Sequence, residues 1–437
     1  MKTALDNFFD LTGLKTNVKR EILAGFTTFI SMAYILFVNP EILGASGMDK
    51  GAVFTATALA SAIGCLLMGL LAKYPIATAP SLGINAFFAY SVCIGMNIPW
   101  QTTLAGVFVA SIIFLLITVF KLRELIIDAI PADLKAAISA GIGLFIAFIG
   151  LQGGGLIVAN KSTLVGLGSF SGSTWVTVFG LIVVSILMVM RVPGAIFIGM
   201  VLSAIFGIAT GNIQMPHAFV APAPSMDQTF LVALSHLKDI NTLQMWVVVI
   251  TFLLVTFFDT AGTLIALAQQ AGFLQNNKMP RVGKALMSDS TAMLFGSLFG
   301  TSPVGAYVES SAGIAVGGRS GLTAVTTGIC FILGLFFSPL LTVATSQVTA
   351  PALIIVGVLM AQSMARITWT KLEIAIPAFL TVAGMPLTYS ISDGLALGFI
   401  AYPITMIAAR KSKEVPALMY VLFFVFVIFF WVLNIEK

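Results

Sequence analysis

Charged residues are scarce in this chain. Of its 437 residues only 9% are Asp, Glu, Lys or Arg, and the mean hydropathy is +1.05, whereas a soluble domain carries about 25% charged residues. The apolar residues form long runs without charge, such as 104–120 and 415–432. These runs approach the roughly 20 residues that an α-helix needs to cross a bilayer. The composition therefore excludes a soluble globular protein and predicts an all-α integral membrane protein.

Cysteine and histidine are also rare. The three cysteines, Cys65, Cys93 and Cys330, lie far apart inside apolar runs, which is typical of small packing residues. The two histidines, His217 and His236, both fall in one long polar loop. We therefore expect no metal site and no cofactor. The net charge of +5 is not gathered in one patch, and this argues against a nucleic-acid partner.

Apolar runs bounded by Pro, Gly and charged residues predict about 14 transmembrane segments. They lie near residues 22–42, 52–72, 80–96, 102–120, 134–151, 174–190, 193–210, 245–266, 286–299, 304–317, 320–345, 350–366, 372–389 and 391–409. Residues 1–21 are charged and lack the apolar core of a signal peptide, so they predict a cytoplasmic leader. A further apolar segment, 415–434, could cross the membrane or lie against the bundle, and the sequence leaves both open.

The positions of Lys and Arg set the orientation, because basic residues are enriched on the cytoplasmic side. With the N-terminus inside, the outer segments hold Lys50, Lys161 and Lys238, and Lys437 is unassigned. The other eighteen of the 22 basic residues fall on the inner side. This asymmetry predicts a multi-pass protein of the inner (cytoplasmic) membrane with a cytoplasmic N-terminus.

The segments divide into two sets of seven. An odd number of segments inserts the second set upside down, as in transporters built from inverted repeats. Weak internal symmetry agrees with this: TAP at 78–80 resembles TSP at 301–303, and Pro131 and Pro351 lie at a similar separation. Segments 3 and 10 are short, contain glycines and begin at a proline. Each predicts a short extended stretch before a half-helix, with unpaired backbone N–H groups near the midplane.

Two acids lie inside predicted segments. Asp259 belongs to the eighth segment and Glu309 to the tenth, and neither segment contains Lys or Arg. A carboxylate at bilayer depth costs about 2.5–3.5 kcal/mol or more, which makes each a functional hypothesis. The alternative is a structural acid hydrogen-bonded to neighbouring backbone. Desolvation favours the protonated form, as a proton carrier requires. Glu41, Asp289 and Asp393 lie near segment ends, and we expect them to reach the interface.

Polar and aromatic side chains, including Tyr34 and Ser302, surround the two acids. A planar heterocycle would use carboxylates and amides along its hydrogen-bonding edge and an aromatic ring against its face. Glu309 could accept from a ring N–H, and Asn85 could supply both a donor and an acceptor. The candidate substrate-binding residues are Asn85, Phe87, Phe258, Asp259, Thr260, Tyr307, Glu309 and Ser310, and the candidate proton-coupling residues are Asp259 and Glu309.

Six short motifs carry a family resemblance. They are SPVGAYVESSAG at 302–313, GGRSGLT at 317–323, AGFTTFISMAY at 24–34, GINAFFAY at 83–90, FDTAGT at 258–263 and PLTYSI at 386–391. Together they closely resemble the AzgA-type purine permeases of the nucleobase–ascorbate (nucleobase:cation symporter) superfamily. Two departures stand out: Thr256 occupies a position where many relatives have an acid, and Val304–Ala306 replace residues that are commonly polar.

The resemblance implies proton-coupled uptake of a purine base, such as adenine, guanine, hypoxanthine or xanthine, with the proton as coupling ion. It also implies a homodimer in the lipid membrane, no enzymatic activity, and an elevator-type movement of a core domain against a gate domain. The core would comprise residues 22–121 and 245–345, and the gate 130–210 and 350–410. By motif position Asn85, Asp259 and Glu309 would be linked to substrate and proton.

Other functions remain alternatives. The architecture resembles that of sulfate-type anion permeases, but an oxyanion site would use a basic residue and avoid buried carboxylates, so Asp259 and Glu309 disfavour it. A xanthine/urate or uracil permease is the nearer alternative. A membrane enzyme needs a nucleophile–base pair or metal ligands at depth, and no His, Lys or Arg lies in the interior of a predicted segment. A channel would need a continuous polar stripe, which the segments lack.

Overall fold

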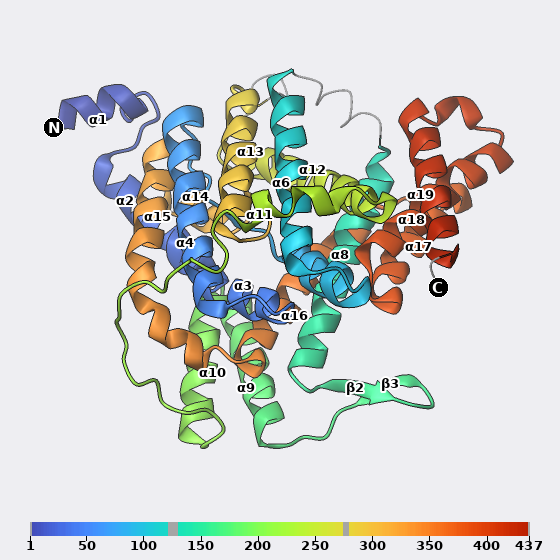
Figure 1. The fold of residues 1–437 in the computed structure, drawn as a ribbon. Coiled ribbons are helices and arrows are strands. Elements are labelled where there is room, and N and C mark those ends of the chain that lie inside the picture. Colours follow the sequence, from blue (N-terminus) through green and yellow to red (C-terminus); the bar gives the residue numbers. More distant parts are fainter. Residues whose placement is uncertain (1, 121–129, 274–278, 436–437) are drawn as a thin grey trace.

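The computed structural model is built mostly of helices, with two pairs of short strands (Figure 1). It describes residues 2–120, 130–273 and 279–435, apart from the side chains of 2–3, 258, 261, 429 and 432–435. Within this described part, nine helical stretches are long and apolar enough to cross a membrane. A largely helical, polytopic membrane protein is therefore confirmed.

The elements follow one another in two halves. The first half contains α1 (Lys2–Phe9), α2 (Val18–Met32), α3 (Ile35–Gly44), α4 (Lys50–Leu67), η1 (Met68–Ala72), β1 (Thr78–Pro80), α5 (Leu82–Ala86), η2 (Phe87–Gly95), α6 (Trp100–Val119), α8 (Ala132–Gly153), β2 (Ile157–Asn160), β3 (Leu164–Leu167), α9 (Gly172–Val189) and α10 (Ala195–Ala209). The second half contains α11 (Val232–Ser235), η3 (Leu237–Ile240), α12 (Leu243–Gln270), α13 (Val282–Phe299), β4 (Val304–Ala306), α14 (Ser310–Val316), α15 (Gly321–Gly334), η4 (Leu335–Val343), α16 (Ser346–Ala361), η5 (Gln362–Arg366), α17 (Leu372–Thr388), α18 (Ile391–Ala408), η6 (Ser412–Glu414) and α19 (Ala417–Ile435).

Strands β1 and β4 are the two extended stretches that the sequence predicts before its third and tenth helices. They pair antiparallel, with Thr78 opposite Ala306, Ala79 opposite Gly305 and Pro80 opposite Val304. All of these residues are buried. Extended chain is tolerated at membrane depth only where its backbone groups are satisfied within protein or water, and the ladder satisfies them here. Helices α5 and η2 continue from β1, whereas α14 after β4 is only seven residues long.

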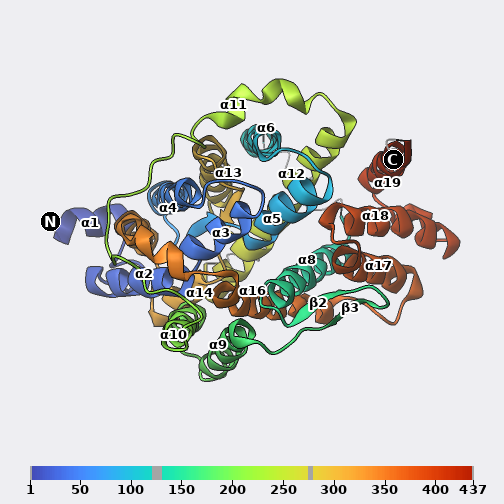
Figure 2. The ribbon, with the colours of Figure 1, turned by 60° about the horizontal axis from the view of Figure 1, so that its bottom comes forward.

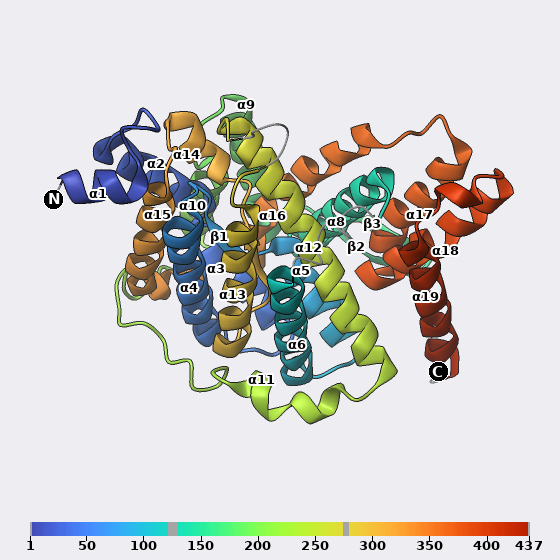
Figure 3. The same cartoon turned by 90° about the horizontal axis from the view of Figure 1, so that it is seen from above.

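The long helices pack as two sets. In the first set, α4 packs against α13 and α15, α6 against α12 and α13, and α2 against α14 and α15. In the second set, α8 packs against α16 and α17, α9 against α10 and α16, and α17 against α18. Figures 2 and 3 show the first set beside the N-terminus and α17–α18 on the opposite side of the molecule.

A close helix crossing holds the second set together. A Cβ at Gly357 on α16 would lie 2.5 Å from the carbonyl oxygen of Gly143 on α8, so the two backbones touch. Small residues allow such approach between transmembrane helices, which lack a hydrophobic drive to associate within lipid. At the edge of this set, α19 packs against α18, where the rings of Phe399 and Phe426 are 5.6 Å apart. The apolar segment 415–434 is thus largely helical, and its helix packs against α18.

Candidate functional site

The candidate site is organised by the β1–β4 ladder. Beyond its paired residues, the ladder is extended by two backbone hydrogen bonds, from Tyr307 N to Ala77 O (2.9 Å) and from Ser81 N to Pro303 O (3.0 Å). The Tyr307 hydroxyl also donates to Pro80 O at 3.0 Å. Segments more than 220 residues apart in sequence are therefore held in a fixed register, and the residues that follow each strand are placed side by side.

Glu309 follows β4 and is partly exposed. Tyr34, which is fully buried at the break between α2 and α3, donates its hydroxyl hydrogen to Glu309 Oε1 at 2.5 Å. A neutral hydroxyl orients a carboxylate without cancelling its charge. The cost of holding that charge in a low-dielectric site is therefore relieved chiefly when a proton or ligand arrives.

Asp259, on α12, is the second partly exposed carboxylate. The Ser81 hydroxyl, at the first position after β1, donates to Asp259 Oδ2 at 2.5 Å. Gly305 of β4 also lies beside this carboxylate. A Cβ at Gly305 would lie 4.0 Å from Asp259 Oδ2 and 3.1 Å from Thr260 Oγ1. Both acids therefore lie beside the ladder, Asp259 against Ser81 after β1 and Glu309 three residues after β4.

Asn85, on α5, is fully buried, and only one of its two polar side-chain atoms has a hydrogen-bond partner among the described residues. Its Oδ1 accepts a hydrogen bond from the Ser302 hydroxyl, while its Nδ2 has no hydrogen-bond partner among the described residues. Behind Ser302, Asn39 Nδ2 donates to Thr57 Oγ1 (2.7 Å) and to Thr301 Oγ1 (2.8 Å). A buried donor without a partner is costly. The Asn85 amide therefore marks a place where a ligand atom can accept.

The other predicted site residues lie around or behind this centre. Ser310 Oγ accepts from Ala77 N at 2.9 Å, so it braces the ladder. Thr260 is fully buried and donates to Asp289 Oδ2 at 2.7 Å. Phe87 is also fully buried, with its ring edge-on to Phe252 at 4.9 Å between centroids. The side chain of Phe258 lies outside the described residues.

Two expectations from the sequence are wrong. Asp289 does not reach the interface: it is fully buried within α13, where it accepts the bond from Thr260. The start of α14 does not offer unpaired backbone amides either. The N–H groups of 310, 311 and 312 donate to the carbonyls of 307, 308 and 309. Because the tight turn uses these amides, they are not free to bind a ligand.

Tyr34 and Ser81 are not among the candidate binding residues that the sequence predicts, although Tyr34 is one of the side chains expected around the two acids. Each is a neutral hydroxyl in an apolar segment, and such residues are common structural fillers. The available signal is position in the sequence, because Ser81 directly follows the TAP stretch at 78–80 and Tyr34 ends the motif at 24–34. Their roles become visible only when the fold brings them against Asp259 and Glu309.

Comparison with known proteins places this site in a family. The sequence profile of the Permease family matches residues 19–397. The chain belongs to the Permease family. Its members are membrane transporters, and the protein is accordingly a transporter rather than an enzyme.

Full-length relatives of this permease include two whose substrates are named. The chain is 55% identical over 436 residues to the guanine/hypoxanthine permease PbuG of Bacillus subtilis, covering 98% of this chain and 99% of that one. It is 40% identical over 433 residues to the adenine permease AdeP of Escherichia coli, covering 97% and 96%. The resemblance to purine permeases that the motifs indicated is confirmed.

Solved structures share the fold of this permease at low sequence identity. The transmembrane domain of the cyanobacterial bicarbonate transporter BicA superposes with a TM-score of 0.61 at 15% identity, covering 90% of this chain and 97% of that one. The murine anion transporter Slc26a9 superposes with a TM-score of 0.61 at 11% identity, covering 94% of this chain and 72% of that one. These similarities establish the fold. They carry no information about the substrate, which has to be inferred from the residues of the site.

Proposed function

We propose that this permease carries purine bases into the cell together with protons. The observation that carries the proposal is the pairing of two partly exposed carboxylates, Asp259 and Glu309, with the unpartnered amide donor of Asn85 around one buried ladder. Guanine/hypoxanthine and adenine permeases that match over nearly their whole length support the same substrate class.

The chemistry of the site favours a ligand with a donor and an acceptor on one edge. A carboxylate accepts from a ring N–H, and the Asn85 amide donates to a ring nitrogen or carbonyl oxygen. In 6-oxopurines such as hypoxanthine and guanine, the N1–H donor lies beside the O6 acceptor. Adenine presents the reverse order at these positions. We therefore take 6-oxopurines as the preferred substrates.

Protonation of the carboxylates provides the coupling. A charged group at bilayer depth costs several kcal/mol, so movement of the loaded site is favoured when Glu309, and with it Asp259, carries a proton. Release of base and proton on the cytoplasmic side restores the empty site. Tyr34 and Ser81 keep the two carboxylates aimed at the ligand throughout.

The first set of helices would act as the core and the second as the gate in an elevator-type movement. The helix packing and the central strand pairing support this division. We further propose 14 transmembrane segments in two inverted repeats of seven, a homodimer, and a place in the cytoplasmic membrane with the N-terminus inside. The β1–β4 pair would then lie at the interface of the two repeats.

Uptake of radiolabelled hypoxanthine into proteoliposomes containing the full chain tests the proposal. Accumulation driven by an inward proton gradient, and competition by unlabelled guanine stronger than by adenine, would support it. Competition by uracil instead would favour the uracil-permease alternative. Transport of bicarbonate or sulfate without any effect of purines would overturn the proposal in favour of an anion permease, whose fold this chain shares.

A further inference from the structure

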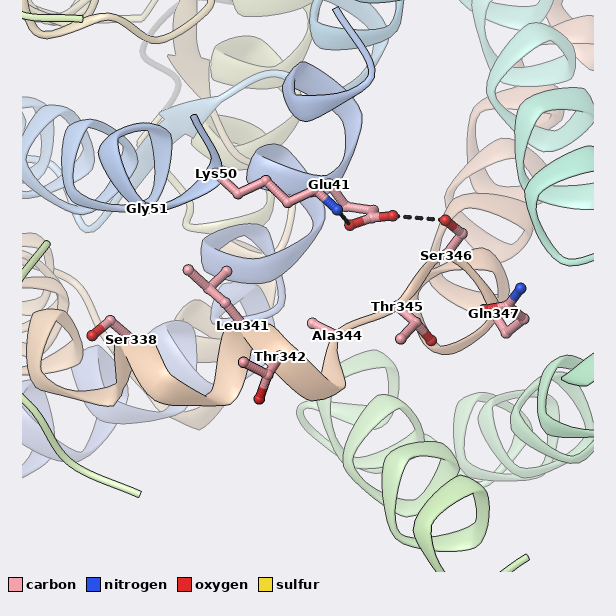
Figure 4. A pocket seen from close by; sticks show the side chains of 10 residues that line it. All are labelled: Glu41, Lys50, Gly51, Ser338, Leu341, Thr342, Ala344, Thr345, Ser346 and Gln347. Atoms are coloured by element: carbon pink, nitrogen blue, oxygen red, sulfur yellow. Dashed lines mark hydrogen bonds and ion pairs between the residues drawn. The ribbon is translucent and has the colours of Figure 1, made fainter. Parts of the chain in front are cut away.

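A pocket of about 520 Å³ lies where α3, α4 and η4 meet the start of α16, and no residue of the purine site lines it. Figure 4 shows its walls: the end of α3 and the start of α4 on one side, and η4 with the start of α16 on the other. Glu41 and Lys50 belong to the first wall, and Thr345 and Ser346 to the second. Helix η4 continues from α15 and packs against α4, so within this lining the start of α16 is the part that belongs to the second set.

One carboxylate bridges the two sets at this pocket. Glu41 Oε2 forms an ion pair with Lys50, and Glu41 Oε1 accepts a hydrogen bond from Ser346 Oγ at 2.6 Å (Figure 4). Glu41 and Lys50 both belong to the first set, through α3 and α4, whereas Ser346 is the first residue of α16 in the second set. The Glu41 side chain is only 18% exposed. The ion pair with Lys50 thus holds Glu41 in place within the first set. The hydrogen bond from Ser346 joins Glu41 to the second set.

A second, weaker contact joins the same two sets. Ser91 of η2 donates to Tyr389 O at 3.5 Å and accepts from Ile391 N at 3.4 Å, at the junction of α17 and α18. The ring of Tyr90 stands edge-on to that of Tyr389 at 6.0 Å. By the distribution of Lys and Arg, this contact and the Glu41–Ser346 bond both lie in the outer half of the protein. The two sets are therefore joined by polar contacts toward one end.

We propose that Glu41 and Ser346 form an outer clasp that closes the core onto the gate and must open once in each transport cycle. The proposal rests on the elevator movement under "Proposed function". A hydrogen bond to a charged acceptor is among the stronger kinds, and relative movement of the two bodies by a few ångströms breaks it. Glu41 and Ser346 are positioning residues: they do not touch the purine, but they set how often its site is open to the outside.

Reversible cross-linking tests whether the two residues must separate. Glu41→Cys and Ser346→Cys are combined in a chain whose Cys65, Cys93 and Cys330 are replaced by Ser, and uptake is measured before and after bridging with a short bis-methanethiosulfonate. Bridging is expected to stop hypoxanthine uptake, and dithiothreitol to restore it. Failure of the pair to bridge, or full uptake by the bridged protein, would overturn the clasp.

Single substitutions test the clasp without engineered cysteines. Ser346→Ala removes the cross-boundary bond and leaves the Glu41–Lys50 ion pair. The outward-open state should gain about tenfold in population, so the apparent KM for external hypoxanthine should fall severalfold and kcat should fall with it. Ser363→Ala is the matched control, since it removes a 3.2 Å hydrogen bond to Ser139 that lies wholly within the second set. Equal kinetics for both variants and the unsubstituted protein would refute the proposal.

The two proposals can fail separately. If the unsubstituted protein transports no purine, the proposed function fails, and the same cross-linking assay is run with whichever substrate is transported. If purines are transported normally but the bridged protein continues to transport them, only the clasp fails.

Discussion

Tyr34 and Glu309, 275 positions apart in the sequence, are joined by a 2.5 Å hydrogen bond from the tyrosine hydroxyl to Oε1. The bond connects the break between α2 and α3 to the turn before α14. It gives Glu309 a fixed direction and leaves its charge uncancelled. Both properties suit a group that takes up and releases a proton next to a ligand.

Glu309→Gln should separate binding from coupling. The amide resembles the protonated acid in charge and shape but cannot release a proton. Uptake driven by a pH gradient should therefore be abolished, while exchange of labelled for unlabelled hypoxanthine across the membrane continues. The measurement is gradient-driven uptake and counterflow in the same proteoliposomes. Concentrative uptake at the normal level would remove Glu309 from the coupling mechanism.

Tyr34→Phe deletes only the hydroxyl that orients Glu309. A hydrogen bond to a charged group contributes about 1.5–3 kcal/mol, and partial compensation by water should reduce the effect, so we expect kcat/KM for uptake to fall by about tenfold. Tyr420→Phe is the control, because Tyr420 donates to Ser412 O at 3.3 Å in an exposed region. Equal losses in both variants would show a general effect of the substitution rather than a role for the Tyr34–Glu309 bond.

The parts of the site that the sequence predicts are those that break its apolar pattern. Asp259 and Glu309 stand out because a carboxylate is costly in a membrane segment, and the extended stretches stand out because a short segment beginning at Pro80 or Pro303 cannot span as a plain helix. Tyr34 and Ser81 break no pattern. Their role depends on contacts between segments far apart in sequence, which no local signal encodes.

Asp289 illustrates a different limit. The predicted segment begins at 286, which puts Asp289 near its end, but α13 begins at Val282. The helix therefore continues for about one turn beyond the apolar run, and Asp289 lies well inside it. Buried hydrogen bonding to Thr260 offsets the cost of this position. A helix that packs against polar neighbours need not end where its apolar residues do.

Gly305 should be required for space beside the acids. A Cβ at this position would lie 3.1 Å from Thr260 Oγ1 and 4.0 Å from Asp259 Oδ2. Gly305→Ala should weaken hypoxanthine binding modestly, and Gly305→Leu should abolish uptake because its side chain reaches the carboxylate. Gly262→Ala on α12 is the control, since nothing lies within 4 Å of its added Cβ. Uptake assays with membrane protein levels matched by immunoblot decide the outcome.

Ser302 should set which way the Asn85 amide faces. Its hydroxyl donates to Asn85 Oδ1 and so leaves Nδ2 for the ligand. In Ser302→Ala the amide is free to rotate and to present either its donor or its acceptor, so discrimination between 6-oxopurines and adenine should fall by about tenfold. Competition of hypoxanthine uptake by adenine measures this ratio. An unchanged ratio with reduced overall uptake would assign Ser302 a purely structural role.

Glu21 should contribute strongly to stability rather than to transport. It lies in the first turn of α2, fully buried, and accepts from the backbone N–H groups of Arg319 (2.9 Å) and Ser320 (3.1 Å) and from the hydroxyls of Ser320 (2.7 Å) and Thr323 (2.6 Å). Removing one carboxylate leaves several donors at the start of α15 without an acceptor. At about 1–3 kcal/mol for each buried donor so stranded, Glu21→Ala should lower the unfolding free energy by several kcal/mol.

Thermal unfolding in detergent, followed by fluorescence-detected size exclusion, gives a melting temperature, which should fall with this loss of stability. Glu21→Gln retains one acceptor oxygen and should fall between Glu21→Ala and the unsubstituted protein. Glu414→Ala, at an exposed acid in η6, should leave the melting temperature unchanged. If Glu21→Ala has the same melting temperature as Glu414→Ala, the four hydrogen bonds do not hold α2 to α15. If it melts lower but the surviving folded protein transports with normal KM, Glu21 acts only by joining the two helices.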